Sequence, residues 1–205
     1  MGTFPKIKVC GVTDAQFAQC AEKMGADYLG FIFAARSPRH ITPEAAAAIA
    51  STLAGRAKRV GVFTDTPMPE ILAIAARVPL DAVQLHSLDY GADEILRLKA
   101  AGLEVWRLFR RGCGPVPPDA DAVLLDGVAG GQCGGTGRRA DWEFASEMAA
   151  AGVRVVLAGG ISVANAVAAA ATGCAVLDVN SSLETAPGVK SIARLEAFMS
   201  AVRCG

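Results

Sequence analysis

Short apolar runs, each of strand length, alternate with helix-like segments along the whole of this 205-residue chain. Parallel strands that are buried on both faces have this near-continuous apolar composition. The runs cover Lys6 to Cys10, Asp27 to Phe33, Arg59 to Phe63, Asp81 to His86, Glu104 to Phe109, Asp121 to Asp126, Val153 to Ala158 and Ala175 to Asn180. Their number matches the eight strands that a closed (β/α)8 barrel needs.

The segments between these runs carry the start and stop signals of helices. Several begin with Thr, Ser, Asp or Pro and end near Gly, the residues that favour helix termini. We predict helices at Asp14 to Met24, Pro43 to Leu53, Pro69 to Arg77, Asp93 to Ala101, Asp141 to Ala151, Val163 to Thr172 and Ile192 to Val202. The stretch Arg110 to Asp119 is rich in proline and glycine, so the fifth helix should be short or absent.

These elements predict an α/β fold, a single (β/α)8 TIM barrel over residues 1–205. The 52% of hydrophobic residues suffices for a large core. An open doubly wound sheet is the alternative fold, and it usually carries a glycine-rich fingerprint after its first strand. Here that turn is Cys10-Gly11-Val12-Thr13, which is not such a fingerprint.

Charge and cysteine usage argue against several classes of partner. The 20 Lys and Arg residues balance 20 Asp and Glu residues, which offers no electrostatic footprint for nucleic acid or an anionic membrane. No apolar run approaches the ~20 residues of a membrane span, and the first residues lack the apolar core of a signal peptide, so we expect a cytoplasmic protein. The cysteines form no C-x-x-C pair and no grouping with the two histidines, so we expect neither metal nor disulfides. The oligomeric state stays open.

A thiol and a carboxyl stand at the ends of two predicted strands. Cys10 ends the first strand and Asp126 the sixth, so both should lie on the rim where barrel active sites form. Together they suggest an acid/base pair. Taken singly, Cys10 could be a small core residue and Asp126 an ordinary turn residue.

Side-chain alternation along a strand directs Lys8 into the barrel, together with Cys10. A buried ammonium needs a partner. Asp178 points inward from the last strand, which lies beside the first once the barrel closes, so we predict a contact between Lys8 and Asp178. The alternative is that Lys8 extends toward solvent at one end of the barrel.

Two loops on the same rim suit a phosphate group. Gly159 and Gly160 follow the seventh strand, and Ser181 and Ser182 follow the eighth. Barrels commonly bind phosphate through backbone amides at these two positions. Tight turning alone is the other explanation for either loop.

Two further loops fit a substrate site. The glycine-rich segment 129–137 could form a mobile cover. The loop from Arg36 to Ile41 carries cations suited to a carboxylate, although a solvated basic loop is the commoner role of such residues. The residues thus indicate a phosphorylated, carboxylate-bearing small molecule and an isomerase or lyase that works by proton transfer. No cofactor motif is present, and we expect none.

The chain closely resembles the phosphoribosylanthranilate isomerase family of tryptophan biosynthesis. The matching motifs, in order along nearly the whole chain, are K-V-C-G-V-T at 8–13, G-F-I-F at 30–33, S-P-R-H-I at 37–41, V-G-V-F at 60–63, Q-L-H at 84–86, L-L-D at 124–126, G-G-T-G at 134–137, L-A-G-G-I at 157–161 and D-V-N-S-S-L-E-x-x-P-G at 178–188. The resemblance implies an Amadori rearrangement of N-(5-phosphoribosyl)anthranilate to the carboxyphenylamino-deoxyribulose phosphate, without cofactor.

The resemblance also implies roles for individual residues. Cys10 would be the general base, Asp126 the general acid and Arg39 the ligand of the anthranilate carboxylate. The phosphate would lie on the backbone of Gly159, Gly160, Ser181 and Ser182, and we expect Gly135 and His86 to contact the substrate as well.

Some positions depart from the family pattern, and some features separate rival functions. Ser87, Ala140 and Ser182 replace the usual residues, and Ser182 stands where a glycine would leave the backbone freer beside the phosphate.

A related sugar isomerase would usually have a carboxylate in place of Cys10, and a phosphate epimerase would carry metal-binding histidines at its strand ends. A barrel kept only as a binding module would be expected to have lost Cys10 or Asp126.

Overall fold

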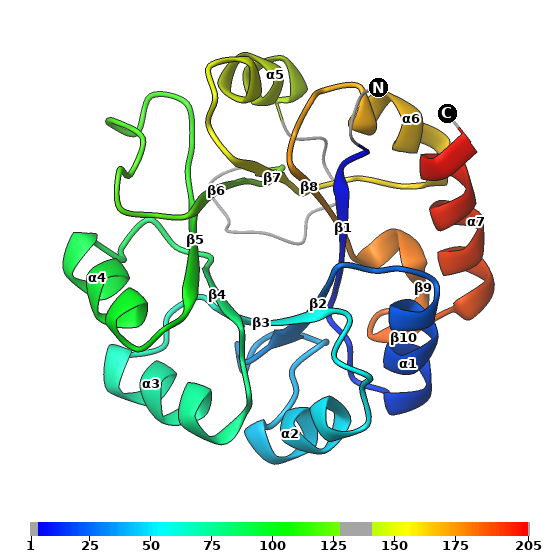
Figure 1. Cartoon of the computed structure of the whole chain (residues 1–205), viewed down its shortest axis with the longest axis horizontal. Helices are drawn as coiled ribbons and strands as arrows, with labels where there is room; N and C mark the ends of the chain where they lie inside the picture. Colours follow the sequence, from blue (N-terminus) through cyan, green and yellow to red (C-terminus); the bar gives the residue numbers. More distant parts are fainter. Residues whose placement is uncertain (1–3, 128–140, 205) are drawn as a thin grey trace.

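The predicted barrel is present in the computed structural model, which describes residues 4–127 and 141–204. Eight parallel strands pair in chain order, and the last pairs with the first to close the barrel (Figure 1). The strands are β1 (Lys6–Cys10), β2 (Tyr28–Ile32), β3 (Lys58–Phe63), β4 (Ala82–Leu85), β5 (Glu104–Leu108), β6 (Ala122–Leu125), β7 (Val155–Leu157) and β8 (Val176–Val179). The predicted fold class is therefore confirmed.

Helices surround the barrel on its outside (Figure 1). They are α1 (Ala15–Lys23), α2 (Pro43–Ser51), α3 (Met68–Arg77), α4 (Ala92–Ala100), α5 (Trp142–Ala150), α6 (Ala166–Ala170) and α7 (Ile192–Cys204), with 3-10 turns η1 (Val163–Asn165) and η2 (Ser181–Leu183). Residues 109–121 between β5 and β6 contain no helix, which confirms that prediction.

The single helix predicted from Val163 to Thr172 is instead two short pieces, η1 followed by α6. Asn165 accounts for the break. Its side chain accepts a hydrogen bond from the Ser162 backbone at 2.8 Å and donates one to the Gly160 carbonyl at 2.9 Å. These local bonds compete with a regular helix and tie the β7 loop in place.

A small antiparallel hairpin, β9 (Glu184–Ala186) and β10 (Val189–Lys190), lies between β8 and α7 (Figure 1). The hairpin is absent from the prediction made from sequence. Its only local signal is Pro187-Gly188, a common turn pair, and Gly188 has the positive φ of +81° that glycine adopts without strain.

An aspartate directly precedes each of β2, β4 and β6 and bonds to the backbone of the strand before. The carboxylates of Asp27, Asp81 and Asp121 accept hydrogen bonds from the backbone N–H groups of Ile7, Arg59 and Val105, each at 2.8 Å. A charged acceptor on a backbone donor makes a strong hydrogen bond. These residues were expected within the strands, and each instead precedes the strand and bonds its neighbour.

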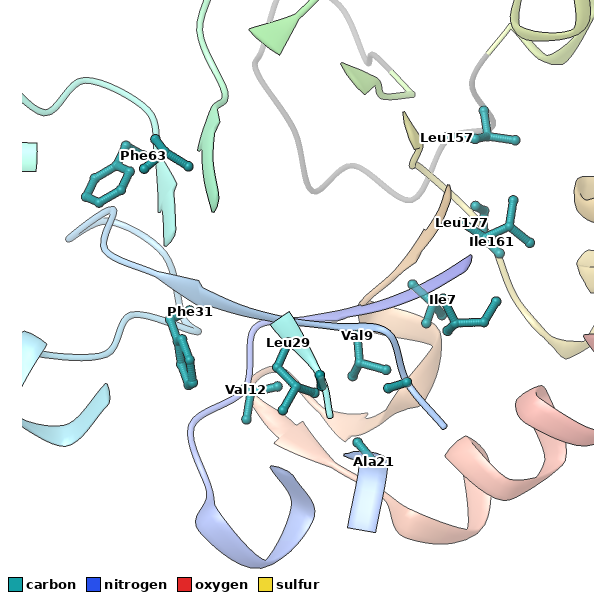
Figure 2. Packing of buried hydrophobic residues seen from close by; sticks show 14 of the residues in the cluster. Ile7, Val9, Val12, Ala21, Leu29, Phe31, Phe63, Leu157, Ile161 and Leu177 are labelled. Carbon is teal, nitrogen blue, oxygen red and sulfur yellow. The ribbon is translucent and has the colours of Figure 1, made fainter. Parts of the chain in front are cut away.

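The two faces of the strands pack into separate cores. Outward side chains such as Ile7, Val9, Leu29 and Leu177 pack toward the helices, where Ala21 of α1 meets them (Figure 2). Inward side chains form a second cluster inside the barrel, and the fully buried Trp106 is its largest side chain. The inward positions above this cluster are free to carry polar groups.

A charged cluster fills the amino end of the barrel. The Glu104 carboxylate accepts hydrogen bonds from Lys58 at 2.9 Å, Trp106 at 2.6 Å and Arg154 at 2.5 Å. Burial tends to raise the pKa of Glu104, and these three donors outweigh it, so its pKa lies below the usual value. Charged side chains that bond to one another therefore occupy this end of the barrel.

Candidate active site

A cavity of about 640 Å³ opens at the carboxyl ends of the strands, where (β/α)8 barrels place their active sites. Most of the site residues predicted from the sequence contribute to its wall, namely Cys10, Arg39, His86, Asp126, Gly159, Gly160, Asp178 and Ser181. Lys8 and Ser182 lie next to wall residues. Gly135 and the glycine-rich loop 129–137 fall outside the described residues.

The Cys10 thiol lies beside a buried ion pair. Lys8 Nζ and Asp178 Oδ2 are 2.6 Å apart, with Lys8 fully buried, so the predicted contact is confirmed and the solvent-directed alternative is wrong. Burial raises the pKa of Cys10, and the positive charge of Lys8 opposes that shift. Burial also tends to lower the pKa of Lys8, but the charges of Asp178 and Cys10 outweigh it and hold Lys8 in its protonated form.

Gly30 leaves the space in which these side chains meet. It pairs with Cys10 across β1 and β2. A Cβ atom at Gly30 would lie 2.9 Å from Cys10 Sγ and 3.2 Å from Lys8 Cε, inside ordinary contact distance. Glycine is therefore required here by the close approach of a thiol and an ammonium rather than by backbone conformation.

Asp126 follows β6 on the same rim and faces a histidine. Its Oδ2 atom lies 3.1 Å from His86 Nε2, and the two side chains are 9% and 14% exposed. Gly159, with a φ of +84°, packs so closely that an added Cβ would lie 2.7 Å from Asp126 Oδ1. Asp126 is thus held between the β4 and β7 ends, with its carboxyl open to the cavity.

The loops after β7 and β8 expose backbone to the cavity. Gly159 and Gly160 have φ angles of +84° and +69° and both line the wall with Ser181. No non-glycine residue within 4–127 and 141–204 has a positive φ, so Ser182 adopts its backbone conformation without strain. Its hydroxyl is buried without a partner among the described residues, which leaves it available as a donor.

Arg39 lies beside the loop that follows β8 and is held by residues that the sequence prediction missed. Its Nε and Nη2 atoms donate to the two carboxylate oxygens of Glu184 at 2.7 and 2.8 Å. Lys190 Nζ donates to Glu184 Oε1 at 2.8 Å. Glu184 lies in the D-V-N-S-S-L-E segment, so its place in a matching motif was the one available signal.

The amino-acid sequence of the chain is similar to those of known proteins. A family model described as N-(5'phosphoribosyl)anthranilate (PRA) isomerase matches residues 7–201. The chain belongs to this isomerase family. The N-(5'-phosphoribosyl)anthranilate isomerase of Rubrobacter xylanophilus is 40% identical over 205 residues, covering 97% of this chain and 98% of the relative.

Solved structures of the family superpose over almost the whole chain. Phosphoribosyl anthranilate isomerase from Thermus thermophilus matches with a TM-score of 0.87 at 35% identity, over 97% of this chain and 98% of that one. A second family structure matches with a TM-score of 0.80 at 27% identity, over 98% of this chain and 100% of that one. It is a complex with reduced 1-(o-carboxyphenylamino)-1-deoxyribulose 5-phosphate.

The family assignment settles the class of activity. The chain is an enzyme, an isomerase of tryptophan biosynthesis that acts on phosphoribosylanthranilate. Over residues 4–127 and 141–204 the structure contains no helix of the length and hydropathy needed to cross a membrane.

Proposed function

We propose that this isomerase performs its Amadori rearrangement with Cys10 as general base and Asp126 as general acid. The observation that carries the assignment is that the thiol and the carboxyl open into one cavity, each positioned by a separate contact. Cys10 stands over the Lys8–Asp178 pair, and Asp126 stands against His86.

The reaction needs one proton delivered and one removed. Asp126 gives a proton to the furanose ring oxygen, the bond from that oxygen to C1' breaks, and the nitrogen lone pair forms a Schiff base. Cys10 as thiolate then takes the proton from C2', and the electrons of that C–H bond form an enolamine. The enolamine becomes the ketone when C1' gains a proton and the hydroxyl on C2' loses one. Cys10 gives up one proton and Asp126 regains one in the course of this exchange, so atoms and charge balance without a cofactor.

Lys8 has a clear part in this scheme. Removal of a carbon-bound proton requires the thiolate, and burial alone would disfavour it. The fully buried ammonium of Lys8 opposes that effect, and Asp178 holds the ammonium at 2.6 Å. We therefore assign Lys8 and Asp178 to positioning and charge compensation at the base.

Substrate binding is assigned to two groups of residues in the cavity wall. Backbone amides around Gly159, Gly160, Ser181 and Ser182 would hold the phosphate, because positive-φ glycines let the chain approach an anion closely. Arg39, which lines the same cavity, would bind the anthranilate carboxylate. The ligand in the related complex carries both a phosphate and a carboxylate, which supports a site with a group for each.

Two variants test the catalytic assignment. Cys10→Ala and Asp126→Asn should each lower kcat by about 10²- to 10⁴-fold, the usual contribution of an acid or base, with KM little changed. Cys174→Ala is the matched control, because Cys174 is equally buried but packs in the outer core against Ala145. It should lower the melting temperature and leave kcat intact. A normal kcat for Cys10→Ala, measured with a coupled fluorescence assay, would rule out this mechanism.

The free cysteines of the chain also support a proposal for its cellular compartment. Cys10, Cys20, Cys113 and Cys174 are free thiols in the described structure. Free thiols persist in a reducing environment, so the cytoplasm is the proposed location.

A further inference from the structure

Arg39 is held by Glu184, which is held in turn by Lys190, and neither Glu184 nor Lys190 is among the described residues of the cavity wall. Arg39 lines the cavity with its side chain 13% exposed, whereas the side chains of Glu184 and Lys190 are 4% and 2% exposed. The fork from Arg39 to Glu184 uses Nε and Nη2. A guanidinium held by two parallel bonds has a fixed plane and direction, and its Nη1 atom is outside that fork.

Arg39 and Lys190 each carry a positive charge and Glu184 carries a negative one, so the group has a net positive charge beside the cavity. Lys190 Nζ donates to three oxygens, the Asn180 carbonyl at 3.0 Å, Asn180 Oδ1 at 2.7 Å and Glu184 Oε1 at 2.8 Å. Three acceptors match the three protons of an ammonium. Two cations therefore share the single carboxylate of Glu184, and a carboxylate of the substrate placed on Arg39 would balance the second cation.

Backbone contacts hold the same group from two more directions. The aliphatic part of Arg39 lies against Gly11, where an added Cβ would come within 2.9 Å of Arg39 Cδ. Gly188, at the turn of the β9–β10 hairpin, packs so that an added Cβ would lie 2.8 Å from the Pro38 carbonyl oxygen. The hairpin thus contacts the Arg39 loop both through its turn and through Glu184.

We propose that Glu184 and Lys190, carried by the β9–β10 hairpin, are positioning residues that hold Arg39 in place to receive the substrate carboxylate. This inference rests on the role proposed above for Arg39. A positioning residue of this kind contributes alike to substrate and transition state, so its loss should appear in KM and leave kcat largely unchanged.

The test is binding of two ligands to Glu184→Gln, to Arg39→Ala and to the double variant. Reduced 1-(o-carboxyphenylamino)-1-deoxyribulose 5-phosphate, the ligand of the related complex, carries the carboxylate, and inorganic phosphate does not. Glu184→Gln should weaken binding of the first roughly tenfold, the worth of one charge-assisted bond, and leave phosphate binding unchanged. In the Arg39→Ala background the same change should have no further effect, because coupled residues are not additive.

Asp81→Asn is the matched control. Asp81 forms the same two-bond fork with Arg59, at 2.7 and 2.9 Å, at the opposite end of the barrel. It should lower the melting temperature without changing either affinity. Glu184→Asp keeps the buried charge but is too short to reach both nitrogens, so it should fold and still lose affinity for the carboxylate ligand.

The outcomes separate the two proposals. If Arg39→Ala binds the carboxylate ligand normally, the role of Arg39 itself is wrong. If Arg39→Ala loses affinity but Glu184→Gln and Glu184→Asp do not, the carboxylate-binding role of Arg39 is supported and the positioning role of Glu184 is wrong. Equal losses for both ligands in the Glu184 variants would show a general structural role and would also overturn the inference.

Discussion

Gly30→Ala should impair Cys10, the proposed base, while leaving substrate binding intact. The added methyl group would lie 2.9 Å from Cys10 Sγ and 3.1 Å from Cys10 Cα. Ordinary contacts begin near 3.5 Å, so the sulfur must move by roughly 0.6 Å or the strand must shift. Gly30 has no positive φ, so the backbone itself accepts alanine and the whole effect comes from this contact.

Two quantities follow from that displacement. Overpacking a core position costs about 1–3 kcal/mol, which for a chain of this size lowers Tm by a few degrees. Misplacing a reacting group by about 1 Å costs up to ~10²-fold in rate, so kcat should fall by roughly 10- to 100-fold. KM should stay within about twofold, since the loops assigned above to the phosphate and the carboxylate are untouched.

Gly61→Ala supplies the control for Gly30→Ala. An added Cβ at Gly61 would lie 2.7 Å from Leu80 Cδ1 and 2.8 Å from Phe63 Cε2, a comparable overlap in the outer core. It should lower Tm by a similar amount and leave kcat near normal. Steady-state kinetics and thermal melts on both variants decide the matter. Equal kcat values in the two variants would refute the claim that Gly30 sets the position of the thiol.

Three further predictions follow. Asp178→Asn removes an anion that raises the pKa of Cys10. The rate of Cys10 alkylation, measured by mass spectrometry of its peptide, should therefore reach half its maximum at a lower pH than in wild type, and an unchanged or higher midpoint would contradict this prediction. Burial tends to raise the pKa of Glu184, but Arg39 and Lys190 outweigh it and hold it at about 2. The ionised Glu184 carboxylate therefore stabilises the fold fully above about pH 4.5, and this contribution is lost as the pH falls toward 2. The difference in unfolding free energy between wild type and Glu184→Gln should shrink over the same pH range. Inorganic phosphate should compete with substrate, and Asn165→Ala should weaken that competition because Asn165 ties down the Gly160 carbonyl; inhibition that more substrate cannot relieve would contradict the phosphate assignment.

The barrel and the Lys8–Asp178 pair were predictable because both follow from local pattern and closure. Apolar runs give the strands, alternation gives the inward positions, and closing the barrel brings the first and last strands together. Strand ends were less predictable. Asp27 and Asp81 continue the runs in sequence, and only the neighbouring strand shows that their carboxylates bond its backbone.

The missed part of the site lies in loops. Arg39 and Glu184 are 145 positions apart, and no periodicity links them. Their contact depends on where the β9–β10 hairpin folds back, which is decided by tertiary packing at Pro38 and Gly188. Gly30 was visible as a glycine within a strand, which indicates a close approach, but the sequence does not say to which atoms.

The seam between β1 and β8 links catalysis to the order in which the chain is made. Lys8 and Asp178 are 170 positions apart, so the surroundings of the proposed base Cys10 come from two segments that are synthesised well apart in time, β1 before β8. A nascent chain that lacks β8 has its thiol but neither the partner of Lys8 nor the β8 loop. Long-range contacts of this kind form late and slowly. We therefore expect turnover to recover during refolding only when β8 has paired with β1.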